Sequence, residues 1–424
     1  MKMVEAATRS RAVAKEHEAR SRKILIVSRD ASIAVIAAII TLALLEIGLR
    51  AAGVKYSGSF YTRDAERGYA LRPYAEGWWI NENPQYAKLN RLGYHDREHS
   101  IAKPPGVVRI AVVGSSYVSA PDVPVNRNFV SVLERLLNRH SEQKYTAEVF
   151  NFGVNAYCPV QSYYTLNKSV WRYSPDIILF VVSNIDILET CRDVAFRRQF
   201  NHRPFFELDS TGKIVPDRTS RSTPMPSRDQ VEAEDRRNQF MNQYRLTTAC
   251  NEALYKVSSR LEEEPPERKT AYASIFYYPH ALTFLPPPRN GPMEQAWRVF
   301  EALVPELKLD SQKHDAELWL LSQGMPEQEN PNPTIGEEFK RKVGADDLYY
   351  WDKRVDAIAQ ENGIHSLRLP PLMATYAAQH HVYLHGFFFT PPGQGHWNDK
   401  GNEVAGQLIA ANLLESSKFF RSIQ

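Results

Sequence analysis

The sequence has few cysteines and a small net charge, and each of these features excludes a class of function. Only three cysteines occur in 424 residues. They match no zinc spacing and form no Cys-x-x-Cys pair, so neither a metal site nor a thioredoxin-like site is predicted. Whether two of Cys158, Cys191 and Cys250 form a disulfide stays open. The net charge of +3 lacks the basic excess of a nucleic-acid-binding protein, so no nucleic-acid partner is expected.

Internal repeats and low-complexity tracts are missing as well, so no repeat architecture is indicated. The hydrophobic content of 43% is enough for a substantial core in one large or two ordinary domains. His380, His381 and His385 stand close together, but no nearby Asp or Glu completes a compact set of metal ligands. We therefore expect a globular protein without a bound metal or other cofactor.

Long uncharged runs are rare, with one exception near the N-terminus. Residues 31–49 contain a single charge, Glu46, and are apolar on every side of a helix, which predicts a membrane-spanning helix over residues 31–50. Residues 1–30 carry eight Lys or Arg and are expected to stay in the cytoplasm, which places the rest of the chain in the periplasm or outside the cell. A buried core helix and a cleaved signal peptide, with Ala51-Ala52-Gly53 at its end, are the alternatives.

Residues 51–106 are rich in aromatic residues, proline and asparagine, and predict a β-rich lead-in to the main domain. A turn is expected at Asn90–Tyr94 and a boundary at Lys103–Gly106. Trp78 and Trp79, with Tyr74 nearby, have two interpretations: a surface that stacks on sugars, or packing inside the lead-in.

From residue 107 onward, short apolar runs alternate with segments of helical periodicity. This alternation predicts an α/β domain over residues 107–415, with a doubly wound parallel sheet. An irregular insertion is expected at about 192–289; within it we predict a hairpin around Ser210–Gly212 and a helix over residues 239–261. The predicted strands cover residues 107–114, 147–153, 176–182, 316–321 and 364–369. A helix is expected over residues 293–307, with a kink or an end at Pro305.

The first of these strands ends in Gly114-Ser115-Ser116, at the sheet edge where open α/β sheets bind ligands. Ser116 is therefore a candidate nucleophile, provided that a base and oxyanion donors are available. The base candidate is His396, which stands in a Gly-Pro loop just before the last long helix, because a neutral imidazole can accept a proton near pH 7.

Four stretches, in this order, resemble the SGNH hydrolases, also called the GDSL esterase superfamily. The stretches are Gly114–Ser116, Asn151–Asn155, Ser183–Asp186 and Gly395–Asn398. The resemblance implies a three-layer, flavodoxin-like sheet with Ser116 as nucleophile and His396 as base. It also implies an oxyanion hole formed by the backbone amides of Ser116 and Gly153 and by the side chain of Asn184. With its apolar helix and lead-in, the chain resembles the membrane-anchored bacterial members of this family.

The sequence departs from the family pattern in three places. Ser115 replaces an aspartate in the turn, and Ile185 separates Asn184 from Asp186. The family's acid, two or three residues before the histidine, is replaced by Gln394 and Gly393. We therefore predict a slow Ser-His dyad in which Gln394 or a backbone carbonyl orients the imidazole, while Asp399 caps the following helix.

These features predict a membrane-anchored, extracytoplasmic esterase. It would hydrolyse or transfer an acyl group, acetyl by expectation, through a serine acyl-enzyme. Its substrate would be an acyl ester, with envelope carbohydrate as the expected carrier. Because the acid is missing from its usual place, a non-catalytic domain that binds a polysaccharide or an envelope protein is the alternative. A membrane-tethered scaffold without a site is a third interpretation.

Overall fold

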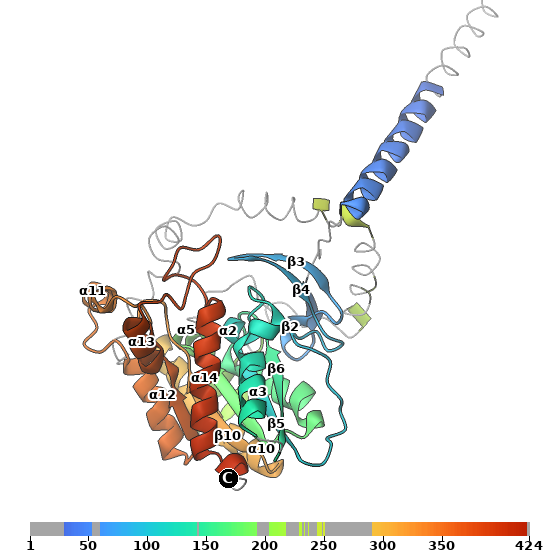
Figure 1. The fold of residues 1–424 in the computed structure, drawn as a ribbon. Helices are drawn as coiled ribbons and strands as arrows, with labels where there is room; N and C mark the ends of the chain where they lie inside the picture. The colour runs from blue at the N-terminus through green and yellow to red at the C-terminus, as the bar shows by residue number, and fades with distance from the viewer. Residues whose placement is uncertain are drawn as a thin grey trace, which may run out of the picture. The chain divides into compact units, whose positions relative to one another are not determined.

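The computed structural model describes residues 29–52, 60–141, 144–192, 203–217 and 291–421, with short pieces between 229 and 250. The chain divides into two compact units, Met1–Gly58 with Gln239–Val257, and Ser59–Asn238 with Ser258–Gln424 (Figure 1). Most of the basic tail and most of the predicted helix over residues 239–261 lie outside the described residues.

The first unit contains an apolar helix, Arg29–Ala51, with a mean hydropathy of 2.4 over its most apolar 18 residues. By length and composition it can cross a membrane, although a signal sequence would meet the same criteria. Its charged residue within the apolar run, Glu46, accepts hydrogen bonds from the side chain of Arg50 and from the backbone N–H groups of Arg245 and Leu246. This carboxylate is therefore compensated by partners within the same unit.

The second unit is built on one parallel sheet of five strands. Their order across the sheet is β11-β10-β7-β5-β6, which is the flavodoxin-like doubly wound order. The predicted α/β class with a parallel sheet is confirmed. The strands are β5 (Val107–Gly114), β6 (Thr146–Gly153), β7 (Ile177–Val182), β10 (Glu317–Ser322) and β11 (His365–Arg368).

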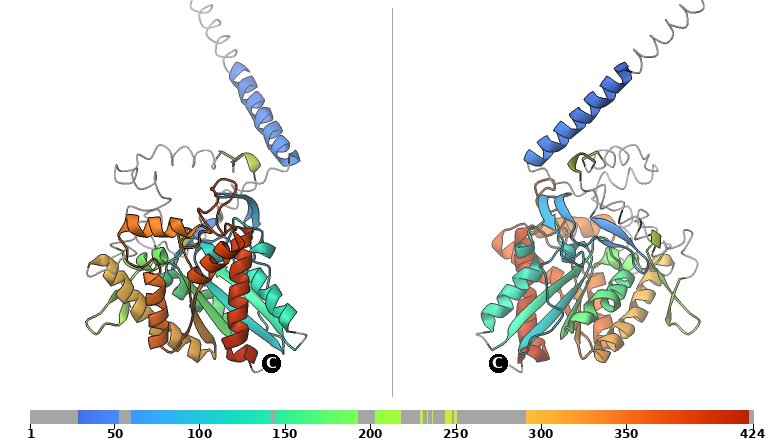
Figure 2. Two further views of the ribbon diagram at one scale, coloured as in Figure 1. Left: turned by 60° about the vertical axis from the view of Figure 1, so that its left-hand side comes forward. Right: turned by 90° about the vertical axis from the view of Figure 1, so that its right-hand side faces the viewer.

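Helices cover both faces of this sheet, which gives three layers (Figure 2). Strand β7 shows why, because all six of its residues are buried and successive side chains enter opposite cores. One face packs against α3 (Phe129–His140), α13 (Leu369–His380) and α14 (Asp399–Ser416), and the other against α4 (Pro159–Thr165), α10 (Pro292–Lys313) and α12 (Tyr350–Glu361). Further elements of this unit are α2 (Ser116–Ser119), α5 (Asn184–Leu188), α11 (Pro333–Val343), α15 (Lys418–Arg421), the π turn Leu166–Val170 and the 3-10 turns Val125–Arg127 and Trp171–Tyr173.

The predicted helix does not end at Pro305. Helix α10 continues through this proline to Lys313. Proline removes one helical hydrogen bond, but Leu303, Val304 and Leu307 around it are completely buried. Packing of this face against the sheet outweighs the local loss.

Residues 60–106 form two antiparallel hairpins and then return to the sheet. The hairpins are β1 (Tyr61–Asp64) with β2 (Gly68–Leu71), and β3 (Glu76–Ile80) with β4 (Pro84–Lys88). The ring of Trp79 packs against those of Phe60 and Tyr61, as the packing interpretation expects, whereas Trp78 stays exposed.

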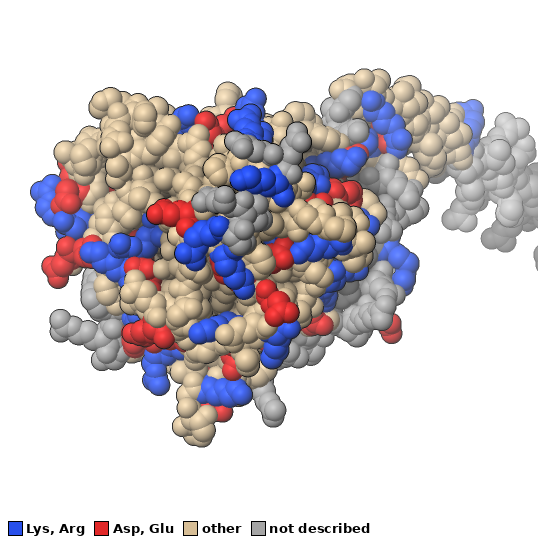
Figure 3. All heavy atoms as spheres, turned by 60° about the horizontal axis from the view of Figure 1, so that its bottom comes forward, with Lys and Arg blue, Asp and Glu red and all other residues tan. Residues whose placement is uncertain are grey.

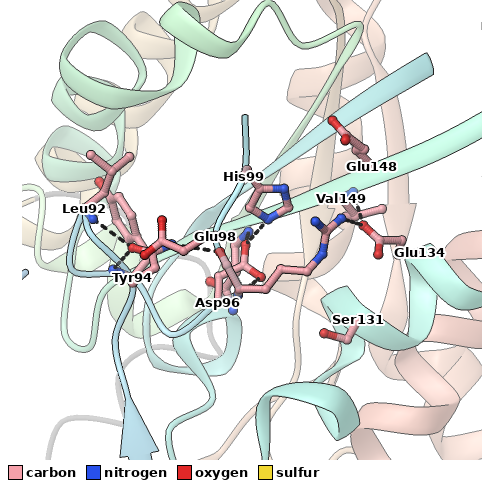
Figure 4. Close-up of polar contacts among 12 residues, drawn as sticks. Leu92, Tyr94, Asp96, Glu98, His99, Ser131, Glu134, Glu148 and Val149 are labelled. Atoms are coloured by element: carbon pink, nitrogen blue, oxygen red, sulfur yellow. Dashed lines mark hydrogen bonds and ion pairs between the residues drawn. The ribbon is translucent and has the colours of Figure 1, made fainter. Parts of the chain in front are cut away.

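Buried polar contacts attach this lead-in to the sheet. Figure 4 shows Asp96, whose carboxylate binds the ring of His99 at 3.0 Å and also accepts the backbone N–H of Asn151 in β6. Close by, the fully buried guanidinium of Arg109 donates to three successive carbonyls, Ser100–Ala102. The lead-in is therefore fixed to the same sheet that carries the serine.

The predicted hairpin around Ser210–Gly212 is present as β8 (Phe206–Leu208) paired with β9 (Ile214–Pro216). Acidic and basic side chains are interspersed on the face shown in Figure 3, in keeping with the small net charge. All three cysteines are free thiols.

Candidate active site

Ser116 is the first residue of α2, immediately beyond the carboxyl end of β5. The turn that presents it needs a glycine, because a Cβ on Gly114 would lie 2.7 Å from a methyl group of Val118 and 2.9 Å from the carbonyl oxygen of Val181. Two of the three departures from the family pattern meet here, since the hydroxyl of Ser115 donates to Asp186 at 2.8 Å. That bond joins the end of β5 to the end of β7.

His396 meets Ser116 across this edge of the sheet. Its Nε2 lies 2.8 Å from the serine Oγ, within normal hydrogen-bond distance. The histidine comes from the loop between α13 and α14, where Asn398 caps the following helix. Asp399, which was expected to be the cap, is the first residue of α14 and pairs with Arg127. The structure thus brings together the predicted nucleophile and the predicted base.

The partner of the histidine's other nitrogen is Glu82, a residue that sequence reasoning missed. One carboxylate oxygen of Glu82 lies 2.5 Å from His396 Nδ1, and the other accepts the backbone N–H of His396 at 2.8 Å. Gln394 does not hold this position, because Glu82 occupies Nδ1. The expectation of a dyad without a carboxylate is therefore corrected to a Ser-His-Glu arrangement. Burial favours the neutral acid, but the contacts with His396 outweigh it and lower the pKa of Glu82.

Glu82 stands in the turn between β3 and β4, where three backbone contacts fix it. The carboxylate of Asp122 accepts the backbone N–H groups of Glu82 and Asn83, and the backbone N–H of Phe389 donates to the Glu82 carbonyl. Burial raises the pKa of Asp122, with the nearby Glu82 carboxylate adding to the effect. The hairpin tip is thus attached both to the loop after α2 and to the histidine loop.

Two of the predicted oxyanion donors, Gly153 and Asn184, already have hydrogen-bond partners. The N–H of Gly153 already donates to the side chain of Asn151 at 2.9 Å, so it is not available as predicted. A Cβ at this glycine would lie 2.2 Å from the backbone nitrogen of Ser119, so close packing against α2 explains the glycine. The side-chain nitrogen of Asn184 points to the sulfur of Met325 at 3.4 Å, which is a weak acceptor.

A buried pair behind the site holds the residues on both sides of His396. The ring of His385 lies 2.8 Å from the carbonyl oxygen of Gly395 through Nδ1 and 2.8 Å from the carboxylate of Glu329 through Nε2. The same carboxylate oxygen accepts the indole N–H of Trp397 at 2.7 Å. His385, Glu329 and Trp397 are all almost fully buried. The pair therefore fixes the loop immediately before and after the proposed base.

Ser116 and His396 line a small depression in the surface. Its walls combine apolar side chains with the polar groups of Ser116, Asp122, His396 and Asn402. No group of three or more potential metal-ligating side chains occurs in the part of the chain that the structure describes. The lining residues are Ser116, Tyr117, Ala120, Asp122, Val123, Phe387, His396, Trp397 and Asn402.

Comparison with known proteins gives distant structural similarity. No protein-family model and no curated protein sequence matches the chain. Among solved structures, it is similar to the acetyl xylan esterase AlAXEase, with 10% identity and a TM-score of 0.37 over 72% of this chain and 100% of that chain. It is also similar to a catalytic mutant of Axe2, an acetylxylan esterase from Geobacillus stearothermophilus, with 10% identity and a TM-score of 0.36 over 73% of this chain and 93% of that chain. The similarity to TesA has 10% identity and a TM-score of 0.32 over 72% of this chain and 97% of that chain. Similarity at this level assigns no reaction to this chain.

Proposed function

We propose that this protein is a membrane-anchored esterase of the SGNH type that hydrolyses or transfers an acyl group through an acyl-enzyme on Ser116. The observation that carries the proposal is the unbroken chain of contacts from Ser116 through His396 to Glu82. A nucleophile, a base and a carboxylate that orients the base are the arrangement required for nucleophilic catalysis by serine. The motive for a non-catalytic binding domain, the missing acid, no longer applies.

The contacts define the proton positions in the first step. A carboxylate accepts hydrogen bonds, so Nδ1 of His396 carries the hydrogen toward Glu82 and leaves Nε2 as the acceptor for the Ser116 hydroxyl. As Oγ bonds to the ester carbonyl carbon, its proton moves to Nε2, and the imidazolium is stabilised by Glu82. That proton then passes to the departing alcohol. Water or a second alcohol releases the acyl group by the same route, which gives hydrolysis or transfer.

For the oxyanion we propose the backbone N–H of Ser116 and the side-chain amide of Asn184. Ser116 is the first residue of α2, where backbone N–H groups have no partner within the helix. Asn184 follows β7, the strand next to β5. A developing oxyanion would be a stronger acceptor for its amide than the Met325 sulfur that it contacts here.

The acyl group that we propose is a small one, acetyl, as expected from the sequence. The location rests on the apolar helix Arg29–Ala51 and on the basic residues before it, which together favour one membrane span with the catalytic unit outside the cytoplasm. Envelope carbohydrate is the acyl carrier that we propose for such a location. Nucleic acid is not expected as a partner.

The experiment that tests this proposal uses the full chain in detergent micelles. Turnover of p-nitrophenyl acetate and labelling by a fluorophosphonate probe are compared for wild type, Ser116→Ala and His396→Ala, each checked for folding by circular dichroism. We expect labelling and turnover in the wild type and their loss in both variants. Equal background rates in all three folded proteins would contradict the proposed esterase and favour the binding domain.

A further inference from the structure

Four apolar side chains form an exposed rim beside the proposed active site. They are Trp78 and Ile80 on β3 and Phe388 and Phe389 in the loop before His396, with exposed fractions of 41%, 45%, 79% and 55%. Large apolar side chains gathered in one exposed place usually mark an interaction site. We call this set the aromatic rim.

The two halves of the aromatic rim belong together. The backbone N–H of Phe389 donates to the carbonyl of Glu82, two residues beyond Ile80, and both views in Figure 2 show the loop next to the β3–β4 hairpin. The rings of Phe388 and Phe389 are 4.9 Å apart. Phe387, the residue before them, lines the depression at Ser116. The aromatic rim therefore stands at the entrance to the site.

The loop that carries Phe388 and Phe389 has no Asp, Glu, Lys or Arg between residues 382 and 398. The hairpin half resembles it, since Gly77–Asn81 is also uncharged. These two stretches carry no charge that could pair with an acidic or basic partner. The free-energy cost of removing uncharged segments from water is small, and Trp and Phe side chains commonly lie at the interface of a lipid bilayer.

The sequence connects the aromatic rim to the apolar helix by a short segment. That helix ends at Ala51, and the next described residue after Ala52 is Phe60, whose ring lies 5.2 Å from that of Trp79, between Trp78 and Ile80 on β3. Nine residues of chain span at most roughly 30 Å. If the helix crosses a bilayer, the strand that carries half of the aromatic rim cannot be far from that surface.

From these observations we propose that the aromatic rim docks on the surface of the lipid bilayer. The inference rests on the membrane anchoring in the proposed function and extends it, because the site would then receive ester substrates that lie at the membrane surface. The outer ends of the four side chains enter the interfacial layer, while Ser116 and His396 remain behind them in the depression.

The test reads the surroundings of one rim residue in the full chain, reconstituted in phosphatidylcholine vesicles. Cys250, the exposed native cysteine, is replaced by serine, and Phe388→Cys is labelled with an environment-sensitive fluorophore. The control is Leu309→Cys. The Leu309 side chain is 47% exposed and lies near the end of α10, a few residues before β10 begins. We expect brominated phosphatidylcholine to quench the label at position 388 and not at 309. If brominated lipid leaves the fluorescence unchanged at both positions, the docking proposal is overturned.

Anchoring is read separately from docking in the same samples. After an alkaline wash, flotation shows whether the chain stays with the vesicles. A retained chain with an unquenched label at position 388 refutes docking and leaves the anchor intact. A chain that is washed off contradicts the anchor, and with it the docking that depends on the anchor.

Activity gives a second readout for docking. The double variant Trp78→Ser, Phe388→Ser should lose about tenfold in the rate on the acetyl ester of a nitrophenol with a long alkyl chain, held in vesicles, because weaker docking lowers access to that substrate. Its rate on dissolved p-nitrophenyl acetate should equal the wild-type rate, as should both rates of a Leu309→Ser control. Equal losses on the two esters would show damage to the site and refute the docking role.

Discussion

The carboxylate of Glu82 lies 2.5 Å from Nδ1 of His396, although 314 positions separate the two residues in the chain. The contact joins the turn of a hairpin that precedes the sheet to a loop that follows its last strand. It supplies the carboxylate that is absent from the residues just before His396. The lead-in is thus part of the proposed catalytic site as well as a structural addition to the domain.

Replacing Glu82 by glutamine should remove most of the activity. The neutral amide cannot stabilise the imidazolium and can leave the ring in the wrong tautomer, so we expect kcat for p-nitrophenyl acetate to fall between about a hundredfold and ten-thousandfold. Glu66→Gln is the matched control, because Glu66 is an exposed acid in the same lead-in. Wild-type kcat in folded Glu82→Gln would show that this carboxylate takes no part in the reaction.

Introducing the family's acid at Gln394 should bring no gain. Glu82 already binds Nδ1 of His396, so an aspartate in the exposed loop has no vacant nitrogen to contact. We expect Gln394→Asp to change turnover by no more than about twofold, as for an ordinary surface substitution. A rise of tenfold or more would mean that Nδ1 lacks a carboxylate partner in solution.

The parts of the site predicted from sequence are those set by local pattern. Apolar runs predict the strands, and the carboxyl ends of parallel strands share one edge, so Ser116 could be placed there before any contact was known. His396 is a candidate because its Gly-Pro loop stands just before the last long helix. Glu82 could not be found this way, because no spacing links a hairpin turn to a loop near the other end of the chain. The available signal was limited to an acid between Asn81 and Asn83 in a turn.

The interpretation of Gly153 fails for a different physical reason. Family resemblance assigns its amide to the oxyanion, but a nearby side chain competes for the same hydrogen, and Asn151 accepts it. At Pro305, in contrast, tertiary burial prevails over a local helix-breaking residue. Sequence reasoning thus finds the positions of the site better than it finds the partners of individual polar groups.

The buried pair behind the loop leads to a prediction about positioning. His385→Ala removes the donor to the Gly395 carbonyl and leaves Glu329 without its histidine. A displacement of His396 by about 1 Å can cost about a hundredfold in rate, so we expect kcat for p-nitrophenyl acetate to fall by at least tenfold, with KM little changed. His385→Asn keeps an amide donor near the position of Nδ1 and should recover part of that loss. All rates are measured well below the melting temperature of each variant, since breaking a buried pair also destabilises the fold.

If folded His385→Ala retains the wild-type kcat, the pair stabilises the loop without positioning the base. A fall in which the asparagine variant is no better than alanine would show that the bond to Gly395 is unimportant. In that case the contact of Glu329 with Trp397 would be the one that matters.

Asp352 should make the stability of the fold decrease as the pH rises. It is completely buried in α12 beside Gln328, and burial raises its pKa to about 8 from the ordinary value of 3.8. The folded protein therefore keeps a proton that the unfolded chain releases near pH 4. Folding takes up one proton between these two values, and stability is lost as the pH rises through that window to about 8. We expect the melting temperature to fall by several degrees between about pH 6 and pH 8.

Asp352→Asn, which imitates the neutral acid, should show a smaller fall, whereas the control Asp346→Asn at an exposed position should follow the wild type. Parallel melting curves for wild type and Asp352→Asn would show that the buried carboxyl is ionised throughout this range.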